Sequence, residues 1–238
     1  NSFKNEDGSV NWLPVCADAH GLVVNRDLFV QYGIPLPTDY ASFVAACKAF
    51  EEVGIRGFTA DYLYDYTCME TLQGLSAGEL TTIAGRKWRT AYSDPANNTR
   101  VGLDDTVWPG GFERMEQFIQ DTGLTAADLE LNYDDVVEMF GNGQLAMYFG
   151  SSAGVGMFQE QGIDATFLPI FSQNGEKWLM TTPYFQVALN RDLEQDPTRR
   201  EKAMQILHVM LSEDAQEQIL AEGQDLLSYS QSVSYHLT

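Results

Sequence analysis

The fold is decided by residues 140–152, which read FGNGQLAMYFGSS. Two glycines near the start of this stretch can take the positive φ that ends a helix. The apolar run at residues 145–149 then suits a short strand that is covered on both faces. Gly150, Ser151 and Ser152 follow, with backbone N–H groups and hydroxyls at the carboxyl end of that strand. Ligands bind at this end of the strands in open α/β sheets, so the stretch predicts both a buried strand and a ligand-binding corner.

Strand-like and helix-like patterns alternate along the rest of the chain. Short apolar runs predict further strands at residues 22–25, 57–60, 165–168 and 185–189. Apolar residues at helical spacing, with capping residues at the ends, predict helices at residues 38–54, 67–75, 112–121, 128–140, 196–211 and 212–223. This alternation favours a compact α/β unit over residues 19–178.

Two further expectations concern local structure. The helix at residues 196–211 is expected to bury one apolar face, made of Ala203, Ile206, Leu207, Met210 and Leu211. Residues 76–110 are rich in Gly, Asn, Asp and Thr, which predicts mostly loop with some helix.

Composition limits the classes of partner. The chain has 238 residues, of which 44% are hydrophobic and 12% aromatic, which is enough for a packed core. Fourteen Lys and Arg residues against 34 Asp and Glu residues give a net charge of −20, which opposes binding to nucleic acid and to anionic lipid surfaces. The sequence contains no apolar run long enough to span a membrane and no signal peptide.

The three cysteines, Cys16, Cys47 and Cys68, lack the spacing of a metal or redox motif. Buried apolar thiols are one interpretation, and a single disulfide with one free thiol is the other.

Four sequence blocks carry a family resemblance. The first block spans residues 13–38, with LPVCADAHGLVVNRDLF at 13–29 and YGIPLPT at 32–38. The glycine-bounded stretch at 140–152 comes far downstream. A Leu-Pro pair with a further strand comes next, and a pair of predicted helices at 203–223 then ends at a glycine. In this order the blocks resemble the sugar-type extracellular solute-binding proteins of bacterial ABC importers, the group that contains maltose-binding protein. The resemblance covers residues 12–235.

The resemblance implies an α/β, periplasmic-binding-protein-like two-lobed fold, with one lobe mostly present and the other partial. Residues 1–17 and 180–227 would belong to the partial amino-side lobe, and residues 18–179 and 228–238 to the carboxyl-side lobe. The family pattern starts in its middle here and stops before its end. The chain is therefore expected to be an internal piece that lacks an amino-terminal βαβ region and the carboxyl-terminal helices.

Candidate ligand contacts lie at the implied lobe crossings and at strand ends, where the family binds its ligands. Sugars are held by aromatic faces and by carboxylates, amides and hydroxyls that bond the ring hydroxyls. The residues of these types at those places are Asp18, His20, Asp61, Tyr62, Tyr64, Gly150, Ser151, Ser152, Thr182 and Tyr184.

The chain departs from the family at one position of this set. Ser152 stands where the family carries a tryptophan, so a stacking platform is lost unless Tyr148 or Phe158 replaces it. Trp12 and Trp178 flank the implied crossings and are further stacking candidates.

The resemblance implies a binding protein without enzymatic activity, cofactor or metal. It would bind a carbohydrate between its lobes and deliver it to the membrane permease of an ABC importer. It would be a monomer outside the cytoplasm, in the periplasm or anchored by lipid to the outer face of the membrane as a lipoprotein. Two other hypotheses stay open, a glycan-active enzyme and an interaction domain without a small ligand.

Enzymatic motifs are weak in this sequence. Asp104–Asp105 and Asp134–Asp135 are neighbours, whereas a glycosidase needs two carboxylates that oppose each other across a pocket. His20, His208 and His236 lack ligand spacing, and no G-x-S-x-G, P-loop or GxGxxG motif occurs.

Overall fold

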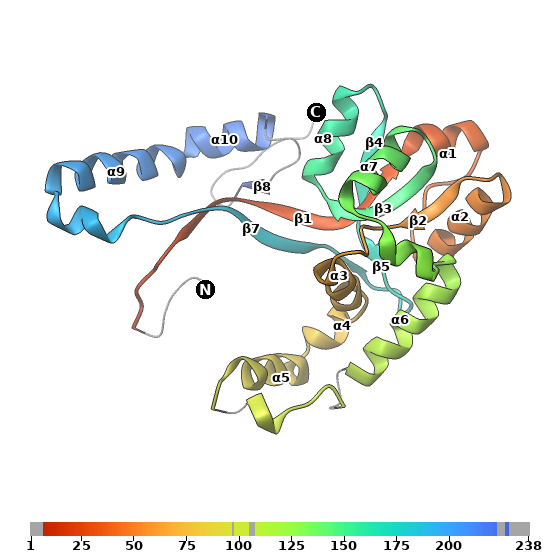
Figure 1. The fold of residues 1–238 in the computed structure, drawn as a ribbon, viewed down its shortest axis with the longest axis horizontal. Coiled ribbons are helices and arrows are strands. Elements are labelled where there is room, and N and C mark those ends of the chain that lie inside the picture. The colour runs from red at the N-terminus through yellow and green to blue at the C-terminus, as the bar shows by residue number, and fades with distance from the viewer. Residues whose placement is uncertain (1–6, 97, 105–107, 223–226, 229–238) are drawn as a thin grey trace. The chain divides into compact units, whose positions relative to one another are not determined.

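The computed structural model describes residues 7–96, 98–104, 108–222 and 227–228. The chain forms two compact units, and the helices and strands are labelled in Figure 1. Unit 1 consists of Asn1–His20, Ser151–Met157 and Thr181–Thr238, and unit 2 consists of Gly21–Gly150 and Phe158–Met180. The assignment of residues 18–179 and 228–238 to a carboxyl-side lobe stays a prediction.

Unit 2 has a mixed α/β architecture. The strands that run wholly or partly through it are β1 (Leu13–Asn25), β2 (Arg56–Thr59), β3 (Leu145–Ser151), β4 (Ala165–Leu168), β5 (Ile170–Phe171) and β6 (Lys177–Trp178). Its helical segments are α1 (Arg26–Tyr32), α2 (Tyr40–Glu52), α3 (Asp65–Leu75), α4 (Ala77–Leu80), α5 (Ile83–Ser93), η1 (Asn98–Arg100), α6 (Trp108–Thr122), η2 (Ala126–Glu130), α7 (Tyr133–Gly141) and the end of α8 (Ala153–Glu160). The predicted α/β class is confirmed.

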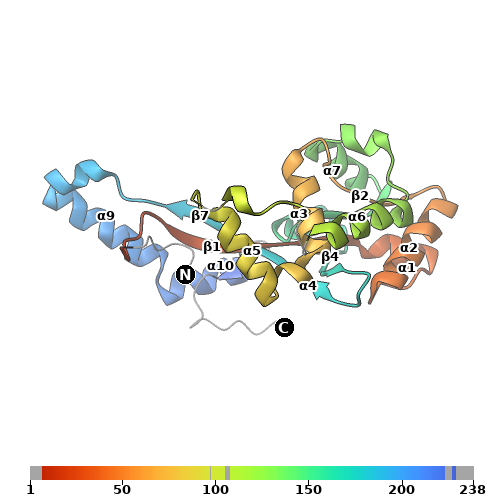
Figure 2. The ribbon, with the colours of Figure 1, turned by 90° about the horizontal axis from the view of Figure 1, so that it is seen from below.

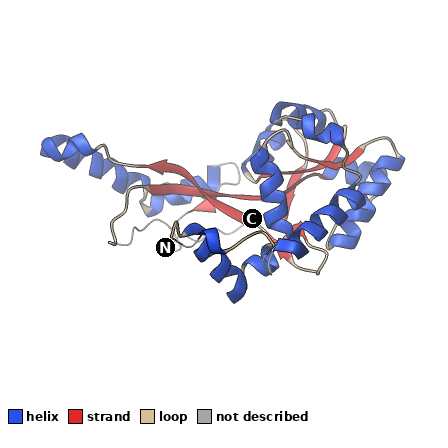
Figure 3. Cartoon of the chain, turned by 60° about the horizontal axis from the view of Figure 1, so that its bottom comes forward, coloured by secondary structure: helices blue, strands red, loops and turns tan. Residues whose placement is uncertain are grey.

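The main sheet has the strand order β2-β3-β1-β4. β2 runs parallel to β3, with Arg56 opposite Leu145, and β1 runs antiparallel to β4, with Leu22 opposite Leu168. β5 and β6 form a separate antiparallel pair. Figure 3 shows the strands of the chain in red and its helices in blue. The helices α3 and α6 pack against each other (Figure 2).

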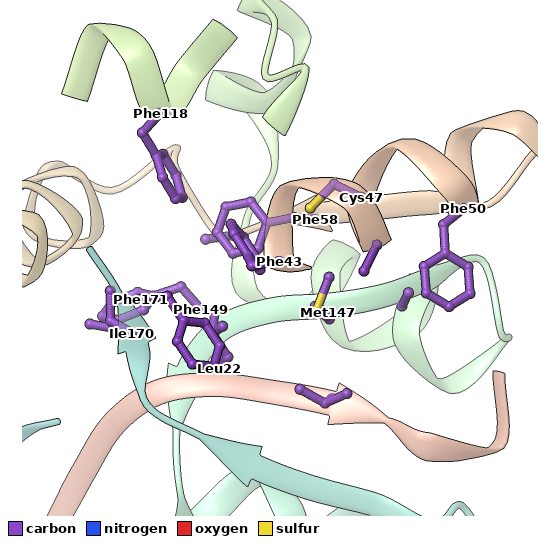
Figure 4. Close-up of a cluster of buried hydrophobic side chains, with 14 of the residues drawn as sticks. Leu22, Phe43, Cys47, Phe50, Phe58, Phe118, Met147, Phe149, Ile170 and Phe171 are labelled. Carbon is purple, nitrogen blue, oxygen red and sulfur yellow. The ribbon is translucent and has the colours of Figure 1, made fainter. Parts of the chain in front are cut away.

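Strand β3 is covered on both faces, as its apolar run predicts. Met147 and Phe149 belong to the largest described core cluster, together with side chains of α2, α6 and β2 (Figure 4). Tyr148 points the other way, and its ring meets Phe140 of α7 at 5.2 Å and Phe158 of α8 at 6.2 Å. Because side chains alternate along a strand, one short apolar run serves two layers of helices.

Aromatic rings fill the first of these layers. Phe43 of α2 stacks on Phe118 of α6, with ring centroids 5.9 Å apart and an interplanar angle of 11°. Phe58 of β2 meets Phe43 edge-on at 5.5 Å. Each ring adds a specific contact to its area burial, so these pairs lock α2 and α6 onto the sheet.

Helix α2 approaches the sheet closely at Gly57. A β-carbon at this position would lie 2.5 Å from Cα of Cys47 and 2.6 Å from its carbonyl oxygen. Only a glycine leaves room for the backbone of α2 there. Asp39 fixes where the helix starts, because its carboxylate accepts a hydrogen bond from the Ser42 backbone N–H at 2.8 Å.

The region 76–110 is more helical than its composition predicts. α4, α5 and η1 occupy most of it, and the Thr82 side chain caps α5. Trp88 and Trp108 are buried and meet edge-on at 5.4 Å, in a second cluster with Leu72 and Leu80. Tertiary packing of these two tryptophans outweighs the loop-forming composition.

Unit 1 is built from the first half of β1 with β7 (Met180–Val187), η3 (Arg191–Gln195), α9 (Pro197–Met210), α10 (Glu213–Glu222) and β8 (Leu227–Ser228). β7 and β8 pair with β1, and Ala17 lies opposite Leu227. The strand expected at 185–189 starts earlier, at Met180, and ends at Val187. Gln216 of α10 is buried and donates to the carbonyl oxygen of Val15 at 2.8 Å.

Helix α9 does not bury the face expected of it. None of its residues is buried, and Ile206 and Val209 are 61% and 67% exposed. Its main described contacts are with η3 and α10, and neither of these is a sheet that the helix could cover. Amphipathic spacing gives an apolar stripe, but burial also needs a facing surface.

Gly57→Ala tests the close approach of α2 to the sheet. We expect it to lower the free energy of unfolding by about 1–3 kcal/mol, because the new methyl group meets backbone that cannot yield. Gly141→Ala at the end of α7 is the control, since its nearest side-chain atoms lie at 3.9 Å and 4.0 Å, and it should change stability by less than about 0.5 kcal/mol. Urea denaturation followed by circular dichroism measures both, and equal effects would contradict the assignment.

Candidate functional site

The carboxylate of Asp18 is the centre of a polar cluster in unit 1. The Thr182 hydroxyl donates to its Oδ1 at 2.5 Å, and the Ser151 hydroxyl donates to its Oδ2 at 3.0 Å. Nε2 of His20 lies 3.3 Å from the same Oδ2. Asp18 is only 4% exposed, so these contacts replace the water that a carboxylate would otherwise bind.

Three strands supply this cluster. Asp18 and His20 are two residues apart on β1, Ser151 ends β3, and Thr182 stands near the start of β7. Each of these places lies within two residues of a point where the chain passes from one unit to the other, at 20/21, 150/151 and 180/181. The cluster therefore ties together three segments of unit 1 next to their connections.

Ser152 stabilises the same corner through its backbone and hydroxyl. Its N–H donates to the carbonyl oxygen of Ala19 at 2.7 Å, and its Oγ accepts from the Ala19 N–H at 3.2 Å. Ser152 is 4% exposed. A tryptophan at this position would not fit this arrangement, so the departure from the family pattern is matched by a local hydrogen-bond pair.

Tyr184 lies two residues beyond Thr182 and is 43% exposed. Its ring contacts that of Phe185, with centroids 4.5 Å apart. Phe185 has a φ of 49°, the left-handed region, and is the one non-glycine residue with positive φ among the described residues. The two rings form an exposed aromatic surface on β7.

Hydrogen bonding decides the charge of Asp18. Burial alone would raise its pKa, but the bonds from His20, Thr182 and Ser151 and the charge of His20 outweigh that effect. The pKa of Asp18 falls from its ordinary value of 3.8 to about 2. The carboxylate is therefore ionised at any physiological pH.

The other predicted contacts lie in unit 2, after β2. Asp61 is 9% exposed and accepts hydrogen bonds from Thr67 at 2.9 Å and from the Tyr66 phenol at 3.2 Å. Burial raises the pKa of Asp61, although both of these hydrogen bonds act to lower it. The rings of Tyr64 and Tyr66 stack with centroids 5.4 Å apart and an interplanar angle of 11°. They are 38% and 57% exposed and form an aromatic platform whose orientation Asp61 fixes.

Tyr62 has a different environment from Tyr64. It is 5% exposed, belongs to the main core and has its hydroxyl 3.3 Å from that of Thr71. Its role as a ligand contact stays a prediction, but Tyr66 is the ring that joins Tyr64 at the surface. Sequence reasoning did not select Tyr66; the alternation Tyr62, Tyr64, Tyr66 was the available signal, since residues two apart can share a face.

The proposed replacements for the missing tryptophan are not available at the surface. Tyr148 and Phe158 are 2% and 0% exposed. Gly150 supports this packing, because a β-carbon there would collide with the Tyr148 ring. Trp12 in unit 1 and Trp178 in unit 2 are half-buried. The Trp178 indole donates to Glu176 at 3.2 Å.

The described residues give few signs of chemistry. Ser151 donates to a carboxylate and not to an imidazole, so the cluster lacks the hydrogen bond that activates a nucleophilic serine. In the described part of the chain no group of three metal-ligating side chains comes together. The cysteines described there are all free thiols. No helix among the described residues is long and apolar enough to cross a membrane.

Comparison with known proteins decides the family. The family described as bacterial extracellular solute-binding protein matches residues 1–234. The chain belongs to this family. The family resemblance of the sequence blocks is thereby confirmed, and the family and its structural relatives are binding proteins.

Solved structures show the same two-lobed fold for this solute-binding protein. A sugar transporter from Bacillus licheniformis, in complex with stachyose, is 15% identical, with a TM-score of 0.68 over 99% of this chain and 60% of the other. RafE in complex with raffinose is 15% identical, with a TM-score of 0.72 over 99% and 62%. A probable secreted solute-binding lipoprotein from Streptomyces coelicolor is 15% identical, with a TM-score of 0.72 over 98% and 58%.

The chain spans about three-fifths of the length of these solved structures. No curated protein sequence matches the chain. The periplasmic-binding-protein-like fold, with one lobe mostly present and the other partial, is confirmed. The ligand-binding roles of Asp18, His20, Ser151, Ser152, Thr182, Tyr184, Asp61, Tyr64 and Gly150 stay predictions.

The low pKa of Asp18 predicts how acid affects stability. The pKa of Asp18 in the folded protein lies below the ordinary value of 3.8. The ionised carboxylate therefore contributes fully to the free energy of unfolding above pH 3.8, and this contribution is lost as the pH falls toward 2. It amounts to about 2 kcal/mol. Urea unfolding at a series of pH values should show Asp18→Asn less stable than wild type near pH 6, with the difference shrinking by roughly that amount at pH 2.

Asp192→Asn, an exposed change of the same charge in η3, is the control and should track wild type throughout. A difference between wild type and Asp18→Asn that stays constant from pH 6 to pH 2 would show that Asp18 is not held ionised by its neighbours.

Proposed function

We propose that this chain forms part of the substrate-binding component of a carbohydrate ABC importer. It binds a sugar and presents it to a membrane permease. It works as a monomer outside the cytoplasm, in the periplasm or attached by lipid to the outer face of the membrane.

The observation that carries the proposal is the Asp18 cluster. A charged acceptor with ordered hydroxyls around it, at the carboxyl end of β3, is suited to bonding the hydroxyls of a polar neutral ligand. Unit 2 separately exposes the stacked pair Tyr64–Tyr66, an apolar face of the kind that packs on the C–H surface of a sugar.

The relatives support the same function. Two of the three solved structures carry sugars, stachyose and raffinose, and the third is a secreted lipoprotein by description. The family is extracellular by description, which supports the location. Membership of the solute-binding family is the support for delivery to a permease.

A glycan-active enzyme is less well supported. Asp18 is the carboxylate of the cluster in unit 1, and Asp61 is the carboxylate beside the tyrosine pair in unit 2. Within unit 1, the described contacts of Asp18 include no second carboxylate that could share acid and base roles. Glu70 acts electrostatically on Asp61 in unit 2, but the oxygens of Asp61 are engaged by Thr67 and Tyr66.

Sugar binding by the 238-residue chain tests the proposal. Maltose, raffinose and stachyose are offered at millimolar concentration in thermal-shift and calorimetric titrations. We expect at least one of them to raise the melting temperature. Tyr64→Ala combined with Tyr66→Ala should weaken that binding at least tenfold, a loss of about 1.4 kcal/mol, because the stacking face is removed.

Tyr92→Ala is the matched control. Tyr92 is also an exposed ring stacked on an aromatic neighbour, with its centroid 4.9 Å from that of Trp88, but it lies on α5. Its loss should leave sugar affinity unchanged. The proposed function would be contradicted if none of the three sugars binds. It would also be contradicted if Tyr92→Ala and the Tyr64/Tyr66 double variant lose the same sugar affinity.

A further inference from the structure

The Asp18 cluster has a defined hydrogen-bond polarity. A hydroxyl has one proton to donate and two lone pairs to accept with. Ser151 and Thr182 both give their proton to Asp18. The oxygens of these two residues therefore turn lone pairs, and not protons, toward any other group that approaches them.

Ser151 illustrates how the arrangement is held. Besides donating to Asp18, its Oγ accepts the backbone N–H of Ala153 at 3.1 Å. Rotation of the hydroxyl away from Asp18 would leave a buried carboxylate oxygen short of a donor, which is costly. The charge of Asp18 thus fixes the direction of both hydroxyl protons.

His20 is also engaged by the carboxylate. Its Nε2 lies 3.3 Å from Oδ2, in position to donate a proton there. Within the described part of the chain, no lysine or arginine forms an ion pair with Asp18. The hydroxyls of Ser151 and Thr182 and Nε2 of His20 are thus turned toward Asp18.

The net charge of the whole chain has the same sign as the charge of Asp18. The whole chain carries a net charge of −20. An anionic ligand that reaches the Thr182 oxygen is repelled by the carboxylate one hydrogen bond further in and by the field of the protein, and it finds lone pairs where it needs donors.

We infer that Asp18 is a specificity-determining residue, which selects neutral ligands whose hydroxyls donate hydrogen bonds and excludes acidic sugars such as uronic acids. The inference rests on the proposed function and names its ligand class. A sugar hydroxyl can donate to Thr182 or Ser151 without disturbing Asp18. The ionised carboxylate of an acidic sugar cannot donate a hydrogen bond to either hydroxyl, because it has no proton to give.

Titration with neutral and acidic oligosaccharides tests the inference. Maltose and raffinose are the neutral probes, and digalacturonate is the acidic probe, all titrated calorimetrically at low and at physiological salt. Wild type should bind a neutral probe at least tenfold more tightly than digalacturonate. The preference should persist at physiological salt, because the repelling charge is adjacent and only weakly screened.

Asp18→Asn removes the charge, keeps the shape and frees the two hydroxyls to rotate. We expect it to reduce the preference for neutral over acidic probes at least tenfold. Asp192→Asn makes the same change of charge at an exposed site of the same unit and should leave the preference as in wild type. Thr182→Val removes a hydroxyl acceptor, so it should weaken the binding of neutral probes. It keeps the charge of Asp18, so the discrimination against digalacturonate should remain.

The outcomes separate the two claims. Equal binding of neutral and acidic probes by wild type overturns the inference and leaves the proposed function standing. An unchanged preference in a folded Asp18→Asn also overturns it. If Asp18→Asn does not fold, Thr182→Val provides the test. Because Thr182→Val retains the charge of Asp18, a loss of discrimination against digalacturonate in that variant would overturn the inference. If no sugar binds wild type, the proposed function fails and the inference fails with it.

Discussion

A buried carboxylate must be surrounded by donors, and Asp18 meets that requirement with side chains from three strands. Thr182 is 164 residues away in the sequence, and Ser151 is 133 residues away. Leaving such a charge without partners would cost several kcal/mol, so the position of each strand in unit 1 is constrained by the others. The same constraint orders the hydroxyls, and this order gives the cluster its chemistry.

Strand β3 connects this constraint to the core of unit 2. Alternate side chains of one run fill two layers, with Met147 and Phe149 on one face and Tyr148 on the other. Rigid packing on both sides fixes the direction in which the strand leaves the core. Ser151 is the last residue of this strand. Binding groups on a rigid element are held more accurately than groups on a loop.

Unit 2 shows a second way of satisfying a buried acid. Asp128 accepts two bonds from Arg56, both at 2.9 Å, and one from Thr59 at 2.7 Å. Here the positively charged guanidinium of Arg56 in β2 pairs with Asp128 in η2. The hydrogen-bonding capacity of this carboxylate is used within the protein, so the ion pair is structural. At Asp18 the partners are hydroxyls and a histidine, which keep acceptor capacity for a ligand. This difference in partners, and not burial as such, separates the candidate site from a structural ion pair.

The sequence by itself determined the strands at 22–25, 57–60, 145–149 and 165–168, because period, glycines and apolar runs are local properties. It also pointed to Asp18 and Thr182, at the crossings that the family resemblance implies, and to Ser151, at the end of a predicted strand. The tertiary structure alone decided that these three meet, since their hydrogen bonds span more than 130 residues. The tertiary structure also buried Tyr62 and left Tyr66 at the surface, although both are tyrosines two residues away from Tyr64. Helix α9 shows the general reason: a pattern gives a side chain its direction along an element, but burial depends on what packs against that face.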